Sequence, residues 1–304
     1  MPSGRKGSRS ATEKLSRAAM LSLRYGLSPD RLRAQLSLMR SCLARYDLTP
    51  SIPITAENLD FHPTLARDLI GIDVAIHGYQ HVAYEDLTPA EQETDLDSAL
   101  CALTRNGFTA TVFRSPYLRL GDVTPRILCS RGISGDSSMS RMALPESHPH
   151  FDAITYAVQR RYPAIGSRAR EIPRGLPIVE LPVSLPDDEI LLDALNIHNP
   201  STLTATYCAM MSEICEAGSL FVLQVHPERF SLCREAIERV VKEAADNGAW
   251  LASLSETAAW VTKQSGALHL WPNGHRFALC VTGDLDAMTL VDFVRRKWRR
   301  LLWS

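Results

Sequence analysis

Segments with apolar residues at helical spacing alternate along the chain with short, nearly continuous apolar runs. The helical segments are 29–46, 64–69, 88–107, 123–132, 203–218, 232–248 and 255–264. The apolar runs are 51–55, 72–78, 109–117, 178–184, 219–227 and 249–254. This alternation predicts an α/β fold in which a parallel sheet or barrel is covered by helices.

Residues at the ends of the predicted helices fit this assignment. Thr88 and Pro89 are suited to the N-cap and the first helical position of 88–107, and Gly107 is suited to the C-terminal end. In the last part of the chain a turn at 272–274 precedes an apolar run, 276–287, which ends in Asp284 and Asp286. This run predicts one more buried strand, followed by a final helix.

Composition and charge narrow the class of protein. The chain has 304 residues and a net charge of -1, and a general nucleic-acid binder is normally strongly basic. We expect residues 1–17 to form a disordered basic leader and residues 18–304 to form a single domain. The seven cysteines are scattered, with no CxxC pair, which indicates a reducing, cytoplasmic environment.

Polar residues directly follow several predicted strands, and in parallel folds functional groups gather at these strand ends. His77 and His81 form an HxxxH element, whose two imidazoles can share one metal ion on a helical turn. Asp284 and Asp286, two residues apart, project to the same side if the strand continues. Each pattern alone also fits ordinary structural or solvated residues.

Three further candidates follow strands. Arg114 can orient a carboxylate by a bidentate pair, and Pro116 with Tyr117 predicts a rigid loop with backbone N–H groups that could face a substrate. His226 ends the run 219–227 and is a candidate proton donor. A surface arginine and a structural histidine are the alternatives.

Taken in order, these motifs resemble the polysaccharide deacetylase (NodB homology) family, similar to carbohydrate esterase family 4. The residues that carry the resemblance are Asp284 and Asp286, His77 and His81, Arg114 to Tyr117, and Leu223 to His226. The run before Asp187 and Asp188 is similar to the approach to the family's fourth motif. The resemblance covers roughly 30–287 and implies a deformed (β/α) barrel.

The resemblance also implies a role for each matched position. Asp286, His77 and His81 would bind a divalent metal, most often zinc, with cobalt, nickel or manganese as alternatives. Asp284 would be the general base, held by Arg114. His226 would protonate the departing amine. The Tyr117 backbone N–H would help to bind the oxyanion, beside Pro116 and Leu223.

The sequence departs from the family pattern in order and in detail. The aspartate motif normally precedes HxxxH, so its place at the C-terminus predicts a circular permutation. Residues 272–304 would then supply the first strand and helix, and the strand 276–282 would insert beside 51–55 and 249–254. Gly283 and Leu118 stand where the family usually has a larger residue and a glycine, and no aromatic residue is evident near Asp187.

These observations predict a metal-dependent N-deacylase that acts on an N-acylated sugar, as a nucleotide-linked or lipid-linked precursor in the cytoplasm. A deformylase, an enzyme acting on ureide-like amides, and an inactive barrel that binds glycan or a partner protein are the alternatives. The final helix places Leu290, Val294, Trp298 and Leu301 among many basic residues. It predicts either a barrel helix or, through 290–303, peripheral contact with the inner face of a membrane.

Overall fold

The computed structural model describes residues 24–162, 175–264 and 271–302, so the predicted leader 1–17 lies outside the described residues. Ten strands form one sheet in the order β5-β7-β8-β10-β1-β2-β3-β4-β6, with β9 paired to β10. Every pairing is parallel. The strands are β1 (Ser51–Ile54), β2 (Asp73–Ile76), β3 (Val112–Phe113), β4 (Gly135–Asp136), β5 (Ser140–Met142), β6 (Val179–Glu180), β7 (Val183–Leu185), β8 (Leu220–Gln224), β9 (Ala249–Leu251) and β10 (Phe277–Thr282).

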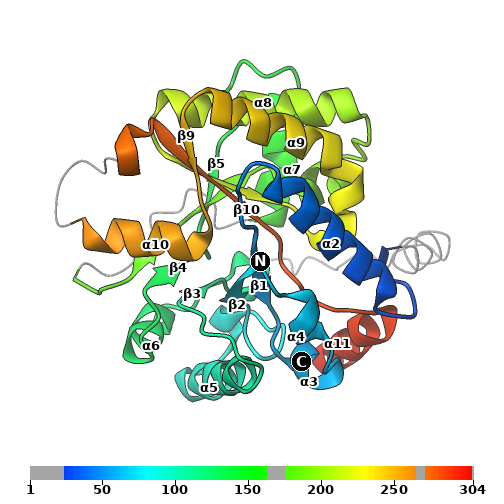
Figure 1. The fold of residues 1–304 in the computed structure, drawn as a ribbon. Helices are drawn as coiled ribbons and strands as arrows, with labels where there is room; N and C mark the ends of the chain where they lie inside the picture. The colour runs from blue at the N-terminus through cyan, green and yellow to red at the C-terminus, as the bar shows by residue number, and fades with distance from the viewer. Residues whose placement is uncertain (1–23, 163–174, 265–270, 303–304) are drawn as a thin grey trace, which may run out of the picture.

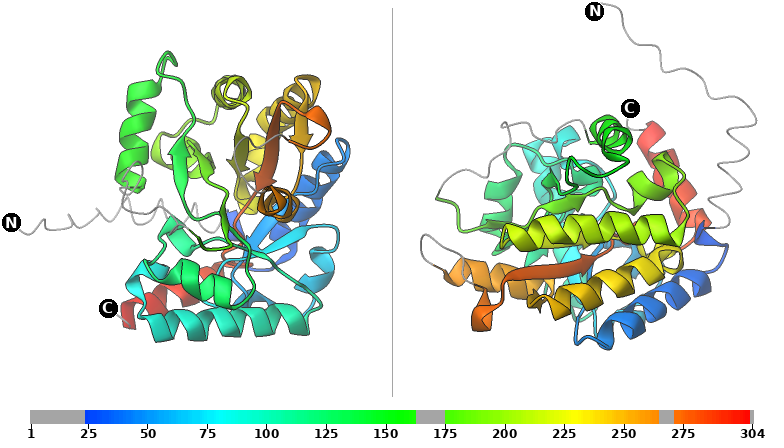
Figure 2. Two further views of the ribbon diagram at one scale, coloured as in Figure 1. Left: turned by 90° about the vertical axis from the view of Figure 1, so that its left-hand side faces the viewer. Right: turned by 90° about the horizontal axis from the view of Figure 1, so that it is seen from above.

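Helices surround this curled sheet, which forms a half-barrel (Figure 1). Figure 2 shows α2, α9 and α8 packed beside one another, while α10 contacts β2, β3, β4 and β6, and α5 packs against α6. The α-helices are α2 (Asp30–Ala44), α3 (Glu57–Phe61), α4 (Leu65–Asp68), α5 (Pro89–Arg105), α6 (Thr124–Ser130), α7 (Phe151–Arg161), α8 (Pro200–Glu216), α9 (Phe230–Asp246), α10 (Leu254–Lys263) and α11 (Leu290–Leu302). The predicted α/β class is confirmed. No described helix is long and apolar enough to cross a bilayer.

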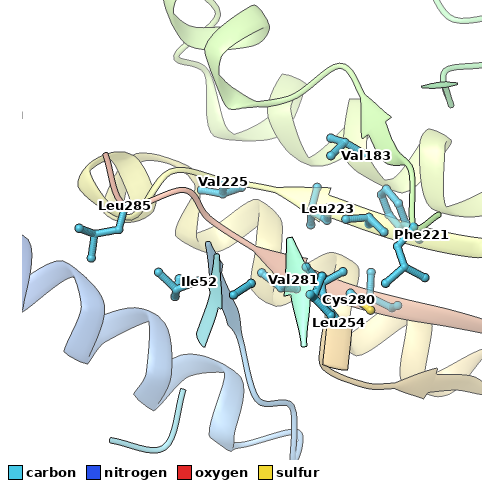
Figure 3. Packing of buried hydrophobic residues seen from close by; sticks show 14 of the residues in the cluster. Ile52, Val183, Phe221, Leu223, Val225, Leu254, Cys280, Val281 and Leu285 are labelled. Atoms are coloured by element: carbon cyan, nitrogen blue, oxygen red, sulfur yellow. The ribbon is translucent and has the colours of Figure 1, made fainter. Parts of the chain in front are cut away.

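The core lies between the sheet and these helices. Figure 3 shows Ile52 of β1, Leu223 of β8 and Val281 of β10 packed together, and the side chains of all three are fully buried. All six residues of β10 are buried, as are all five of β8. Strands buried on both faces read as continuous apolar runs, which is why the sequence located them so well.

The strand from the end of the chain occupies the middle of the sheet. β10 pairs with β8 along five residues, from Ala278 with Leu220 to Thr282 with Gln224. On its other side it pairs with β1 through Thr282 and Ser51, and its first half pairs with β9. The predicted insertion of this strand beside 51–55 and 249–254 is therefore what the structure contains.

The local signals worked best where a cap or a proline fixes the backbone. Thr88 accepts a hydrogen bond from the Glu91 backbone N–H and forms a capping box with Glu91 at the start of α5. The single strand expected over 178–184 is wrong, because the structure contains two strands separated at Pro182, which has no N–H to donate. The short strand β5 and the helix α7 were not predicted.

Close packing explains why glycine stands at position 283, where the resemblance led us to expect a larger residue. A Cβ atom at this position would lie 2.2 Å from the backbone carbonyl oxygen of Val225 and 3.0 Å from Cδ of Pro227. The neighbouring backbone cannot move away without breaking the bond from Val225 N–H to the Thr282 carbonyl oxygen, which is 2.8 Å long. Close approach of the two chain segments just beyond β8 and β10 therefore requires glycine.

The substitution Gly283→Ala tests this packing. We expect it to lower the free energy of unfolding by about 3 kcal/mol, because the added methyl group meets backbone atoms. Gly107→Ala, whose added methyl group would have no atom within 4 Å, should cost about 1 kcal/mol for its positive φ alone. Urea denaturation measures both values, and equal losses would contradict the packing explanation.

Candidate functional site

The carboxyl ends of neighbouring strands bring the candidate residues to one edge of the sheet. His77 follows β2, Arg114 follows β3, and Asp284 follows β10. β1 lies between β10 and β2, and its end joins both loops: Thr55 N–H donates to the Leu285 carbonyl, and Ala56 N–H donates to the Gly78 carbonyl. Parallel topology thus assembles residues that are about two hundred positions apart in the sequence.

Two histidines and one aspartate form a compact cluster at this edge. Oδ1 of Asp286 lies 3.0 Å from Nε2 of His81 and 3.4 Å from Nε2 of His77. The three potential ligand atoms all lie within 4.8 Å of one another. An imidazole–imidazole–carboxylate set of this kind is a common ligand set for zinc and leaves coordination positions open.

The two histidines lie on a loop and not on the helical turn that was expected. Gly78 has φ +73°, and a Cβ there would meet Oδ2 of Asp95 at 2.9 Å. The Asp95 carboxylate of α5 accepts hydrogen bonds from the backbone N–H groups of Tyr79 and Gln80, at 2.8 and 2.9 Å. Asp95 therefore shapes the loop that turns both imidazoles toward Asp286.

The protonation of the cluster suits a cation. Nδ1 of His77 lies 2.8 Å from the Arg114 carbonyl oxygen, and this contact leaves Nε2 facing Asp286. Nε2 of His77 and Oδ1 of Asp286 are buried, with no hydrogen-bond partner among the described residues. Burial lowers the pKa of His81 to about 3, so its imidazole is neutral. Burial by itself raises the pKa of Asp286, but His81 and Arg296 outweigh it, and the pKa lies well below the usual value.

Asp284 lies beside this cluster and is firmly held. Because Leu285 bridges to β1 in an extended conformation, Asp284 and Asp286 project to the same side. Nη1 of Arg114 contacts Oδ1 of Asp284 at 2.8 Å, and Nε2 of Gln224 donates to Oδ2 at 3.3 Å. Oδ2 of Asp284 lies 3.7 Å from Nε2 of His77.

The contact of Arg114 with Asp284 is not the bidentate pair that was expected. The Arg114 guanidinium is fully buried, and its Nε and Nη2 donate to the backbone oxygen and hydroxyl of Ser137, at 3.1 and 2.8 Å. Only Nη1 is left for the carboxylate. Ser137 thus fixes the plane of the guanidinium and, through it, the position of Asp284.

His226 lies next to Asp284 in the strand register, since Gln224 of β8 pairs with Thr282 of β10. Nδ1 of His226 is 2.8 Å from Oδ1 of Asp188, whose other oxygen accepts from Arg229 at 3.1 Å. Burial alone lowers the pKa of His226, but the Asp188 carboxylate raises it well above the usual value. The Asp188 carboxylate therefore favours the protonated imidazole.

The other candidate residues lie around the same edge. Pro116 and Tyr117 belong to a short 3₁₀ turn in which Tyr117 has φ +62°. The Tyr117 ring packs edge-to-face on His81, with ring centroids 4.4 Å apart. Leu223 is fully buried inside β8, three residues before His226. Their roles toward a substrate remain predictions.

Sequence reasoning assigned no role to several residues that build this site. Asp188 was noted only for its place after the run 178–184, while Asp95, Ser137 and Gln224 were not singled out. Asp95 lies on the polar side of an acidic helix, where one carboxylate cannot be told from another by pattern. Only their contacts with His226, the histidine loop, Arg114 and Asp284 identify them.

Comparison with known proteins supports the fold. No family model matches the sequence, and no curated protein sequence matches it. Among solved structures, a protein described as a candidate polysaccharide deacetylase from Mycobacterium smegmatis aligns with a TM-score of 0.60 and 20% identity, over 86% of this chain and 88% of that chain. The PuuE allantoinase aligns with a TM-score of 0.57 and 15% identity, over 86% and 80%. The chain thus has the curled half-barrel of the deformed (β/α) barrel type expected from its sequence.

The Asp188–His226 pair gives a direct prediction. In Asp188→Asn the counter-charge is lost while burial and the Arg229 cation remain, so the pKa of His226 should fall. A titration of the His226 ring proton by NMR measures this shift. Asp193→Asn, which removes a different partner of Arg229, should leave a raised pKa; the same raised value in Asp188→Asn would contradict the assignment.

Proposed function

We propose that this protein is a metal-dependent hydrolase that removes an acyl group from the amide nitrogen of a sugar or glycan precursor. The observation that carries the proposal is the cluster of His77, His81 and Asp286 with Asp284 beside it. A divalent metal held by the cluster would polarise water and the acyl oxygen, and the ligand set favours zinc. The candidate deacetylase from Mycobacterium smegmatis, which shares the fold, supports this substrate class.

The surrounding residues would carry the proton transfers. Asp284, held by Arg114 and Gln224, is placed to take a proton from the attacking water. His226, kept protonated by Asp188, is suited to deliver a proton to the departing amine. The Tyr117 backbone N–H would contact the developing oxyanion, with Pro116 and Leu223 shaping its surroundings.

A second candidate keeps the same machinery and changes the substrate. The structural likeness to an allantoinase favours a ureide-like amide as the alternative to an N-acyl sugar. The metal and proton-transfer residues serve either reaction, because both require attack of water on an amide carbon. Assays with N-acetyl sugars, N-formyl sugars and ureides under the same conditions distinguish them.

The order of the motifs fits a circular permutation within this fold. β10, from the end of the chain, lies near the centre of the sheet between β8 and β1 and leads directly into the loop that contains both aspartates. In the family pattern that place belongs to the first strand. On this proposal 272–304 supply the first strand and helix of the barrel.

We infer the cellular setting from smaller observations. All seven cysteines are free, which fits a reducing compartment such as the cytoplasm. In that compartment the proposed substrate would be a nucleotide-linked or lipid-linked precursor. On α11, an outer stripe of Val291, Val294 and Trp298 is 53%, 43% and 65% exposed, whereas Phe293 is buried. This stripe differs from the apolar side expected from the sequence, and the side chain of Leu301 lies outside the described part. The exposed stripe, with Arg295 beside it, favours peripheral contact with an anionic membrane.

Substitutions in the cluster test the proposed chemistry. His77→Ala and Asp286→Ala should lose bound metal and activity together. Asp284→Asn should retain metal and lower kcat by about 100-fold or more, because only the proton acceptor is removed. Metal analysis and turnover of an N-acetyl sugar measure the two effects. Wild-type protein that binds no zinc, cobalt or nickel would favour the inactive, glycan-binding or partner-binding barrel.

Vesicle flotation tests the membrane contact. The wild type should float with anionic vesicles, and Trp298→Ala should weaken binding about tenfold, since burial of a large apolar side chain contributes about 1.5–3 kcal/mol. Leu232→Ala, at a residue of α9 that is 55% exposed, is the matched control and should bind as the wild type does. Absence of wild-type flotation at low salt would contradict the contact.

A further inference from the structure

The final helix places one arginine against the metal-binding cluster. Nη1 of Arg296 lies 2.6 Å from Oδ2 of Asp286, and the side chain of Arg296 is only 9% exposed. The two oxygens of this carboxylate therefore face different ways. Oδ1 faces the imidazoles of His77 and His81, and Oδ2 faces the guanidinium.

Arg296 is itself held in place by packing. Its guanidinium carbon lies 5.0 Å from the centre of the Phe293 ring, which is one helical turn earlier on the same side of α11. The Phe293 ring stacks on Tyr25 at 5.2 Å, and both belong to a small buried cluster with Ala287. This apolar group of Tyr25, Ala287 and Phe293 is separate from the main core. The guanidinium is thus a packed component of the site.

The neighbouring arginine provides a contrast. Arg295 is 42% exposed, lies 4.2 Å from the centre of the Phe61 ring and pairs with Asp292 at 3.6 Å. It shares the helix, the charge and an aromatic contact with Arg296, but its ion-pair partner is not a residue of the cluster. The basic run predicted from the sequence therefore contains residues with different surroundings.

We propose that Arg296 is a positioning residue for the metal-binding carboxylate, and that α11 is for this reason part of the metal centre. The proposal rests on the proposed metal-binding function of His77, His81 and Asp286. By engaging Oδ2, the guanidinium holds the carboxylate in the rotation that directs Oδ1 between the two imidazoles. It also neutralises a buried charge, which is costly when unpaired.

The guanidinium also repels a bound cation, so two effects oppose each other. The carboxylate lies between the two positive groups and reduces their repulsion. Without Arg296, the one anionic ligand of the cluster is free to rotate, and loss of the outer partner of a metal ligand typically weakens affinity by about 10–100-fold. We expect the loss of orientation to exceed the relief of repulsion.

Cobalt titration of the full chain tests this role, with calorimetry for the dissociation constant and the visible spectrum of the bound ion for its ligand geometry. Arg296→Met should weaken binding about 10–100-fold and alter the spectrum. Arg296→Lys, which keeps the charge, should restore part of the affinity. Arg295→Met, the matched control, should stay within about threefold of the wild type, as expected for a partly exposed ion pair. Circular dichroism of the metal-free variants checks that each is folded.

The outcomes separate this inference from the function on which it rests. If the wild type binds cobalt and Arg296→Met binds it as tightly with the same spectrum, Arg296 has no positioning role, and the metal centre stands. Equal losses in Arg295→Met and Arg296→Met would also overturn the role, since they would reflect a general weakening of α11. If the wild type itself binds neither cobalt nor zinc, both the metal centre and this inference fail.

Discussion

The site depends on the parallel pairing of β10 between β8 and β1. This pairing sets Thr282 opposite Gln224 on one side and Ser51 on the other, and it carries the chain on to Asp284 and Asp286. The close approach at Gly283 shows how little space separates the neighbouring segments. Every contact between the aspartates and the histidines follows from this register, because a shift by one residue would turn both carboxylates away.

Buried charges around this strand are compensated in two separate groups. Arg114 neutralises Asp284, and Arg296 neutralises Asp286, while Asp188 pairs with both His226 and Arg229. Beside Asp286, burial favours the neutral form of His81, whereas the Asp188 carboxylate favours the protonated form of His226. Opposite protonation of two histidines within one site would suit the proposed metal ligand and the proposed proton donor.

The terminal helix links this chemistry to the surface. One side of α11 brings Phe293 against Tyr25 and Arg296 against Asp286, and the opposite side leaves Val294 and Trp298 exposed. Residues three apart on a helix share a side, so the proposed positioning role and the proposed membrane contact use different residues of α11. A membrane that contacts the exposed side of α11 would therefore lie close to the candidate site.

The sequence by itself determined the α/β class and most helices and strands, because these depend on apolar periodicity, and it named the candidate metal-binding and acid–base residues from side-chain chemistry and motif order. The sequence could not distinguish Arg296 from Arg295, or Asp95 from its acidic neighbours, because these residues are alike in type and in local pattern. Only the tertiary structure decided which of them meets the site. Contacts between strands distant in sequence depend on sheet order and register, which local patterns do not encode.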